Sequence, residues 1–244
     1  MLIQVAVAKV SKYASSESGD TLEMIERPQG GLSFVLADGQ RSGRSAKAIS
    51  NLVTSKAISL LAEGIRDGAA ARATHDYLYN QRGGRVSATL NILSIDMVTK
   101  TLVLSRNSHC PAIIQTGPGA QIVLNEPTAP LGVHRQNKPQ IKELPLSTGM
   151  LAVIYTDGIH SAGENRPEGP LDVPGLVDDL YARYMTCEEA ARSIADALLE
   201  EALHRDQGRP QDDMSLLVVA ILPREGGEMR RLTVTLPVPP LLRP

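Results

Sequence analysis

The sequence contains few of the residues that mark a specialised class of protein. Its 244 residues include no tryptophan and one phenylalanine, and aromatic side chains make up only 3% of the chain. The core must therefore be built from leucine, isoleucine, valine and alanine. The two cysteines, Cys110 and Cys187, are too few for a disulfide framework and follow no metal-ligand spacing, which favours a reducing compartment.

Long apolar runs and an excess of one charge are also missing. No apolar stretch approaches the roughly 20 residues that span a bilayer, and the first residues, MLIQVAVAKVSKY, do not form a signal peptide. Lysine and arginine number 25 against 27 aspartate and glutamate residues, a net charge of −2. A nucleic-acid-binding domain usually carries a basic excess or stripe. We therefore expect a cytoplasmic protein that binds neither membrane nor nucleic acid.

The hydrophobic pattern that is present predicts strands, two helices, more strands, two helices and a final strand. Apolar positions step by three and four along the helical segments, and runs rich in Val, Ile, Leu and Thr form the strand segments. The sequence TCEE predicts a capping box in which Thr186 and Glu189 begin the last helix. The predicted strands are 2–10, 30–38, 85–116 (a meander), 121–124, 140–146, 151–156 and 212–222, and the predicted helices are 42–63, 68–80, 173–184 and 186–204.

This order of elements predicts an α+β fold. Runs of strands between pairs of helices do not suit a doubly wound parallel sheet, in which strands and helices alternate regularly. We expect two mainly antiparallel sheets flanked by helices. Residues 223–244 are expected to be a linker and tail, in which Thr233–Val238 adds one edge strand or, alternatively, makes a dimer contact.

Aspartates stand at the ends of three of the most apolar strands. They are Asp38 in FVLADGQRSG, Asp157 in LAVIYTDGIHS and Asp212 in QDDMSLLVVA. A single Asp-Gly pair is usually only a turn. Three acidic strand ends are different, because clustered carboxylates repel one another unless a cation neutralises them. Ligand sets made only of oxygen suit Mg²⁺ or Mn²⁺ better than zinc.

These stretches, in this order, resemble the metal-dependent protein phosphatases of the type 2C (PP2C) family. The resemblance is to the bacterial branch of sporulation stage II and sigma-factor-regulator serine phosphatases, and it covers residues 1–222. The family's YTDG is intact at 155–158 and its PLG at 130–132. Its GD, DG, NAGHPP and DDxT motifs are similar to ESGDTLEM, FVLADGQRSG, NSHCPA and DDMS.

The resemblance implies that residues 1–222 form a four-layer αββα sandwich of two mainly antiparallel sheets flanked by helix pairs, and that the chain is a two-metal hydrolase. In the family, a metal-activated water hydrolyses phosphoserine and phosphothreonine on a regulatory protein, such as an anti-sigma-factor antagonist, in sporulation or stress responses. Asp38 would bridge two Mn²⁺ or Mg²⁺ ions, and Asp38 and Asp157 would be central to catalysis. The metal-site residues implied are Asp20, Asp38, the carbonyl of Gly39, Asp157, Asp212 and Asp213, the last as a ligand or as a support behind the ligands. The resemblance leaves open whether the chain is a monomer or a homodimer.

Two segments depart from the family pattern. After its DG the family usually has Met or Val and then Gly-His-Gly, whereas this chain has QRSGR, so Arg41 and Arg44 either bind phosphate or are solvated loop charges. His109 and Cys110 replace Gly-His, and we interpret them as side chains packed under the sheet, with a role in catalysis as the alternative. The altered segments leave room for a catalytically degenerate fold that binds phosphoproteins. An enzyme for small phosphate esters is a third possibility.

Overall fold

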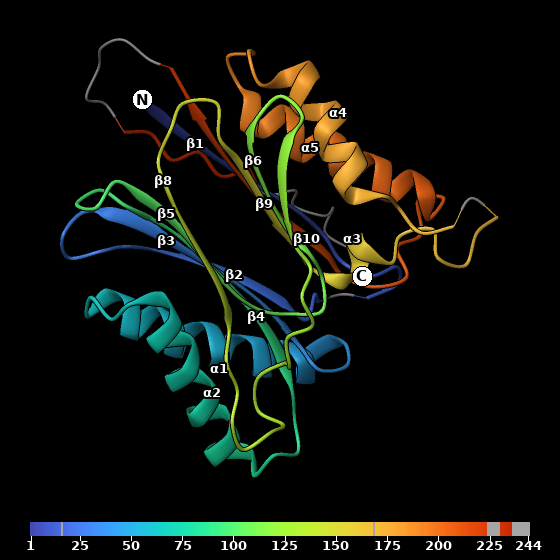
Figure 1. The fold of residues 1–244 in the computed structure, drawn as a ribbon. Coiled ribbons are helices and arrows are strands. Elements are labelled where there is room, and N and C mark those ends of the chain that lie inside the picture. Colours follow the sequence, from blue (N-terminus) through green and yellow to red (C-terminus); the bar gives the residue numbers. More distant parts are fainter. Residues whose placement is uncertain (16, 168, 224–229, 236–244) are drawn as a thin grey trace, which may run out of the picture.

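The computed structural model describes residues 1–15, 17–167, 169–223 and 230–235. It has four layers, with two sheets packed face to face between two pairs of helices (Figure 1). All strand pairs of both sheets are antiparallel. The structure therefore confirms the predicted αββα sandwich.

Each sheet contains five strands, and long apolar strands occupy the centre of each. The first sheet has the order β1-β10-β9-β6-β7, and the second has the order β2-β3-β4-β5-β8. The first sheet consists of β1 (Leu2–Val10), β10 (Met214–Leu222), β9 (Leu151–Tyr155), β6 (Ala112–Gly117) and β7 (Ala120–Leu124). The second consists of β2 (Asp20–Glu26), β3 (Gly31–Gly39), β4 (Ala88–Asp96), β5 (Thr101–Asn107) and β8 (Gln140–Pro145).

Helices cover the outer face of each sheet. The second sheet is covered by α1 (Gly43–Ala62) and α2 (Asp67–Arg82), and the first by α4 (Val173–Tyr184) and α5 (Ala190–Arg205) (Figure 1). A single-turn helix, α3 (Asp157–His160), follows β9. Helix α1 buries the apolar positions that step by three and four along its sequence, which explains why this segment is a helix: Ala46, Ile49, Val53, Ala57 and Leu61.

Three apolar cores lie between the four layers and pack them together. Between the sheets, Phe34 and Leu93 of the second sheet pack in one cluster with Ile154 and Leu217 of the first. The other two cores lie between each sheet and its helix pair. Strands β3, β9 and β10 are buried on both faces, which accounts for their nearly continuous apolar sequences.

The start of α5 differs from the prediction. The helix begins at Ala190, residues 186–189 form turns, and the predicted capping box is absent. Instead, Gln4 of β1 accepts a hydrogen bond from the Ala191 backbone N–H at 3.3 Å, and the Glu189 carboxylate pairs with Arg192 at 3.2 Å. A side chain distant in sequence thus takes the place of the local cap.

Strand β2 is an additional element that the hydrophobic pattern did not predict. It lies at the edge of the second sheet, and its sequence DTLEMIE exposes Glu23 and Met24. Charged residues are common on edge strands, where one side lacks a partner. In the tail, residues 230–235 are not in a strand, and the rest of the predicted strand lies outside the described residues. Within the described ranges, no helix is both long and apolar enough to cross a membrane.

Candidate metal centre

Three of the predicted ligands converge on one pocket at the ends of the two sheets. Asp38 ends β3, Asp157 begins α3, and Asp212 precedes β10, so both sheets contribute. The pocket has a volume of about 390 Å³. Its other lining residues are Lys12, Gly39, Gln40, Arg41, Ser42, Ser87, Thr89, His109 and Pro130.

Asp20 lies beside Asp38 as its cross-strand partner. The two residues are directly opposite in the β2–β3 register, where side chains point to the same face and like charges destabilise the pair. Asp20 is only 1% exposed, and its Oδ2 accepts a hydrogen bond from Thr156 Oγ1 at 2.9 Å. Asp20 therefore stands behind the pocket wall and is positioned by the residue that precedes Asp157.

Burial and neighbouring carboxylates raise the pKa of Asp20, Asp38 and Asp157. Burial, followed by repulsion from Asp20, Asp157 and Asp212, raises the pKa of Asp38 to about 9. Burial raises the pKa of Asp20 to about 6 despite the hydrogen bonds that it accepts. For Asp157, burial and then Asp212 raise the pKa, whereas His109 lowers it. Without a cation, this arrangement of four carboxylates is electrostatically unfavourable.

Glycines beside three of these aspartates allow the elements to approach closely. A Cβ on Gly39 would lie 2.1 Å from the carbonyl oxygen of Ala46 in α1, and one on Gly158 would lie 2.2 Å from that of Asp213. A Cβ on Gly19, which precedes Asp20, would lie 2.7 Å from the Cβ of Ala46. The Asp-Gly pairs are therefore required by packing as well as by turn chemistry.

Asp213 has its side chain directed toward the N-terminal loop. Its Oδ1 accepts from the Lys12 backbone N–H at 2.9 Å, and its Oδ2 accepts from the Gly19 N–H at 2.8 Å. The side chain is buried and does not line the pocket. These bonds fix the loop that leads into Asp20, which favours the supporting role over direct ligation.

The two arginines predicted to contact phosphate differ in position. Arg41 lines the pocket, and its φ of +80° is in the left-handed region that favours glycine. Arg44 does not line the pocket; its side chain is 95% exposed and lies 3.9 Å from Glu17. Lys12 does line it, although sequence reasoning did not select this lysine, which lacks a motif of its own.

The interpretation of His109 and Cys110 as packed side chains is correct only for the cysteine. Cys110 is 1% exposed. His109 has a 58% exposed side chain, lines the pocket and lies 3.7 Å (Nε2) from Asp157 Oδ2. Its loop is held by the buried Arg106, whose guanidinium donates to the carbonyls of Ser108 and Cys110. The substitution of the family's glycine thus adds an imidazole to the pocket.

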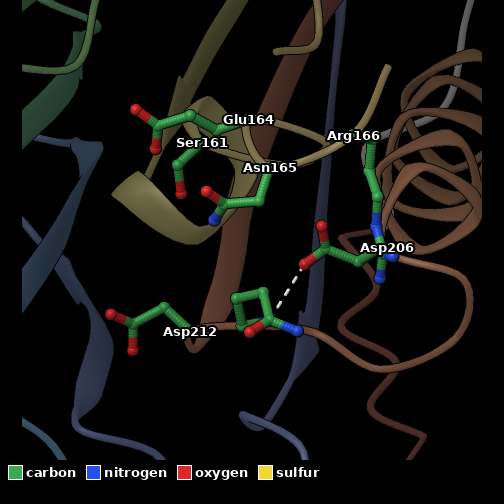
Figure 2. A pocket seen from close by; sticks show the side chains of 7 residues that line it. Ser161, Glu164, Asn165, Arg166, Asp206 and Asp212 are labelled. Atoms are coloured by element: carbon green, nitrogen blue, oxygen red, sulfur yellow. Dashed lines mark hydrogen bonds between the residues drawn. The ribbon is translucent and has the colours of Figure 1, made fainter. Parts of the chain in front are cut away.

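A second pocket of about 310 Å³ lies on the other side of Asp212 and is lined by the loop after α3 (Figure 2). At its wall, the Asp206 carboxylate accepts from the backbone N–H of Gly163 at 3.0 Å and of Gln211 at 2.9 Å. Asp206 thereby links the loop that follows Asp157 to the residue before Asp212. The Asp212 carboxylate points away from Asp206 (Figure 2).

The donor set of the first pocket fits hard divalent cations. In the part of the chain that the structure describes, no three His, Cys, Asp or Glu side chains gather closely enough to hold an ion by themselves. Mg²⁺ is commonly bound by one or two carboxylates and several waters, so carboxylates spaced around an open pocket suit it. The repulsion between Asp38 and the neighbouring aspartates also favours a bound cation. The assignment of individual ligands remains a prediction.

Comparison with known proteins relates the chain to sporulation phosphatases. A family model described as stage II sporulation protein E (SpoIIE) matches residues 28–222. Stage II sporulation protein E of Bacillus subtilis (strain 168) is 24% identical over 222 residues, which is 90% of this chain and 26% of the relative. Stage II sporulation protein E of Priestia megaterium is 22% identical over 223 residues, which is 90% of this chain and 36% of the relative. The chain thus spans about a third or less of the length of these relatives.

Solved structures share the fold at low sequence identity. The PP2C phosphatase domain of SpoIIE from Bacillus subtilis, with a fragment of its regulatory domain, has a TM-score of 0.74 at 23% identity, with 92% of this chain and 64% of that chain covered. The structure of RsbX in complex with magnesium has a TM-score of 0.66 at 18% identity, with 89% of this chain and 94% of that chain covered. The fold is therefore that of PP2C phosphatases, and because the family model matches most of its length, the chain belongs to the stage II sporulation protein E (SpoIIE) family.

Proposed function

We propose that this chain is a metal-dependent phosphatase that hydrolyses phosphoserine and phosphothreonine on a regulatory protein. The observation that carries the proposal is the convergence of Asp38, Asp157 and Asp212 on one pocket at the meeting point of the two sheets. Membership of the SpoIIE family supports the same activity.

The proposed cofactors are two Mn²⁺ or Mg²⁺ ions. Asp38, the Gly39 carbonyl, Asp157 and Asp212, which line the pocket, would hold the ions, with Asp20 behind the pocket wall. When bound, such ions neutralise the carboxylates, lower the pKa of a water and offset charge on a phosphoryl group. Asp213 supports the site through its bonds to the N-terminal loop.

Cationic and polar side chains of the pocket are proposed to orient the substrate. Lys12 and Arg41 line the same pocket as the carboxylates, so they are placed to hold phosphoryl oxygens. Arg44 lies outside the pocket and is assigned no such role. His109, which lines the pocket and lies 3.7 Å from Asp157, is proposed to contact the leaving group or the substrate backbone.

A small regulatory phosphoprotein, such as an anti-sigma-factor antagonist, is the proposed substrate. Support for this substrate comes from the family alone. The chain spans only part of its SpoIIE relatives, so the substrate of those proteins is a proposal for this chain. The two cysteines are free thiols, which fits the reducing environment of the cytoplasm. We leave open whether the chain acts as a monomer or a homodimer.

The test is hydrolysis of para-nitrophenyl phosphate with Mn²⁺, with EDTA, and by the Asp38→Ala and Asp157→Asn variants. We expect turnover that requires metal and falls by at least ~100-fold in either variant while circular dichroism stays unchanged, because electrostatic stabilisation of the reaction is lost. Substantial turnover in Asp38→Ala would contradict the two-metal account. Metal binding without any turnover would instead support a phosphoprotein-binding module.

A further inference from the structure

Three chain segments lie side by side along one edge of the catalytic pocket. Residues 39–44 lead from the end of β3 into α1, residues 82–89 lead from the end of α2 into β4, and residues 129–138 contain the PLG motif. Backbone hydrogen bonds join the first two, Gln40 N–H to Ser87 C=O at 3.0 Å, and the last two, Leu131 N–H to Ala88 C=O at 2.8 Å. Each segment also contributes lining residues to the pocket: Arg41, Ser87 and Pro130.

These segments carry positive charge only. They contain six lysines and arginines, all exposed, and no aspartate or glutamate, although the whole chain has a net charge of −2. Among the described residues, only Arg44 of the six lies within 4.0 Å of a carboxylate, at 3.9 Å from Glu17. We call this set the basic rim: Arg41, Arg44, Arg82, Arg85, Arg135 and Lys138.

The opposite side of the site has a different character. The second pocket, beyond Asp212, is lined by Glu164 and Asp206 together with Arg166 (Figure 2). Charge is thus only positive along the three segments and mixed at the second pocket. A substrate with negative charge on one side of its phosphorylated residue would be held in one orientation.

We propose that the basic rim binds an acidic segment of the phosphoprotein substrate next to its phosphorylated residue. This inference rests on the proposed phosphatase function and specifies the substrate class. A polypeptide partner fits better than a nucleic acid, because the three segments contain no Phe, Tyr or Trp on which bases stack. The rim also borders the pocket directly, so a substrate segment bound to the rim can continue into the pocket with its phosphorylated residue.

The experiment compares Arg85→Glu/Arg135→Glu with a matched control, Arg183→Glu/Arg192→Glu. The first pair lies in the loops of the rim, the second on α4 and α5 on the other side of the molecule, and neither includes a pocket residue. The probes are a phosphoserine peptide followed by four glutamates, the same peptide with four glutamines, and para-nitrophenyl phosphate.

We expect the rim variant to lose ~10-fold or more in kcat/KM on the glutamate peptide, since two attractive charges become repulsive. Turnover of the glutamine peptide and of para-nitrophenyl phosphate should change less than ~2-fold, and the control variant should match the wild type. High salt should reduce the wild-type preference for the glutamate peptide. An unchanged preference in the rim variant, or tighter binding of a single-stranded oligonucleotide than of the glutamate peptide, would overturn the inference.

Failure of the proposed function would be visible separately. If the wild type with Mn²⁺ hydrolyses none of the probes, the phosphatase proposal fails. The rim is then judged from fluorescence anisotropy of the labelled glutamate peptide: weaker binding to the rim variant alone supports it, and equal binding to all three proteins overturns it.

Discussion

At the scale of single residues, the site is a set of mutually repelling carboxylates. Asp20 and Asp38 face each other across two strands, and Asp157 and Asp212 approach from the other sheet. Burial, and then repulsion from these neighbours, raises the pKa of Asp38 to about 9. This repulsion is unfavourable in the metal-free protein, and a cation bound among the carboxylates would neutralise it.

This repulsion predicts the pH dependence of the metal-free protein. A carboxyl group whose pKa rises from about 4 in the unfolded chain to about 9 in the folded chain binds its proton more tightly when folded. Unfolding therefore releases a proton between these values, and the free energy of unfolding falls as the pH rises. In EDTA, urea titrations should show lower stability at pH 8 than at pH 5, and Asp38→Asn should reduce this difference. A wild-type stability that rises over this range would contradict the prediction.

Arg41 combines a strained backbone with a charge in the pocket. Its φ of +80° costs a non-glycine residue about 1–2 kcal/mol. Arg41→Gly removes this strain and the charge together, so urea titration should show a free energy of unfolding within about 1 kcal/mol of the wild type. The KM for para-nitrophenyl phosphate should rise ~5-fold because a charged phosphate contact is lost. An unchanged KM would show that Arg41 is only a solvated loop charge.

At the scale of elements, glycines determine how closely helices and strands meet at the site. Gly39 lets α1 pack against the end of β3, and Gly158 lets α3 pack against the residues before β10. These contacts place Asp38 and Asp157 on the same pocket. The glycines thus shape the proposed metal site through packing, independently of any carbonyl ligand.

Gly39→Ala should therefore be costly for stability. Its Cβ would lie 2.1 Å from the Ala46 carbonyl oxygen and 2.8 Å from the carbonyl carbon, so the backbone must shift. We expect a loss of about 3 kcal/mol in the free energy of unfolding, measured by urea titration. Gly117→Ala is the matched control, because no atom lies within 4 Å of its added Cβ. Equal stabilities of the two variants would refute the packing argument.

The sequence predicted most elements because their signals are local. The buried strands β3, β9 and β10 are nearly continuous apolar runs, and α1 and α4 have clear helical periodicity. Strand β2 was missed because an edge strand carries charges, and α5 starts late because its cap, Gln4, is 187 residues from Ala191.

The site was predictable where a motif marks it. Asp38, Asp157 and Asp212 each follow or precede an apolar strand, whereas Lys12 and His109 enter the pocket only through the tertiary fold. Motif reasoning also could not separate Arg41 from Arg44, which differ in orientation rather than in type. Contacts between residues far apart in the sequence leave no local pattern from which they can be predicted.

At the scale of the whole molecule, the site joins the two sheets. Asp20 and Asp38 belong to the second sheet, while Asp157 and Asp212 adjoin the first. Ions bound between them would tie the two halves of the sandwich together, so metal binding and folding stability should be linked. The basic rim on the second-sheet side would then present the substrate to a site that both sheets complete.

Calorimetric titration of the wild type with Mn²⁺ measures whether these aspartates bind divalent cations. We predict that two ions bind per chain, that the melting temperature rises with Mn²⁺ concentration, and that Asp38→Ala loses this binding. A wild type that binds no Mn²⁺, or an Asp38→Ala variant that binds it with unchanged stoichiometry and affinity, would contradict the account.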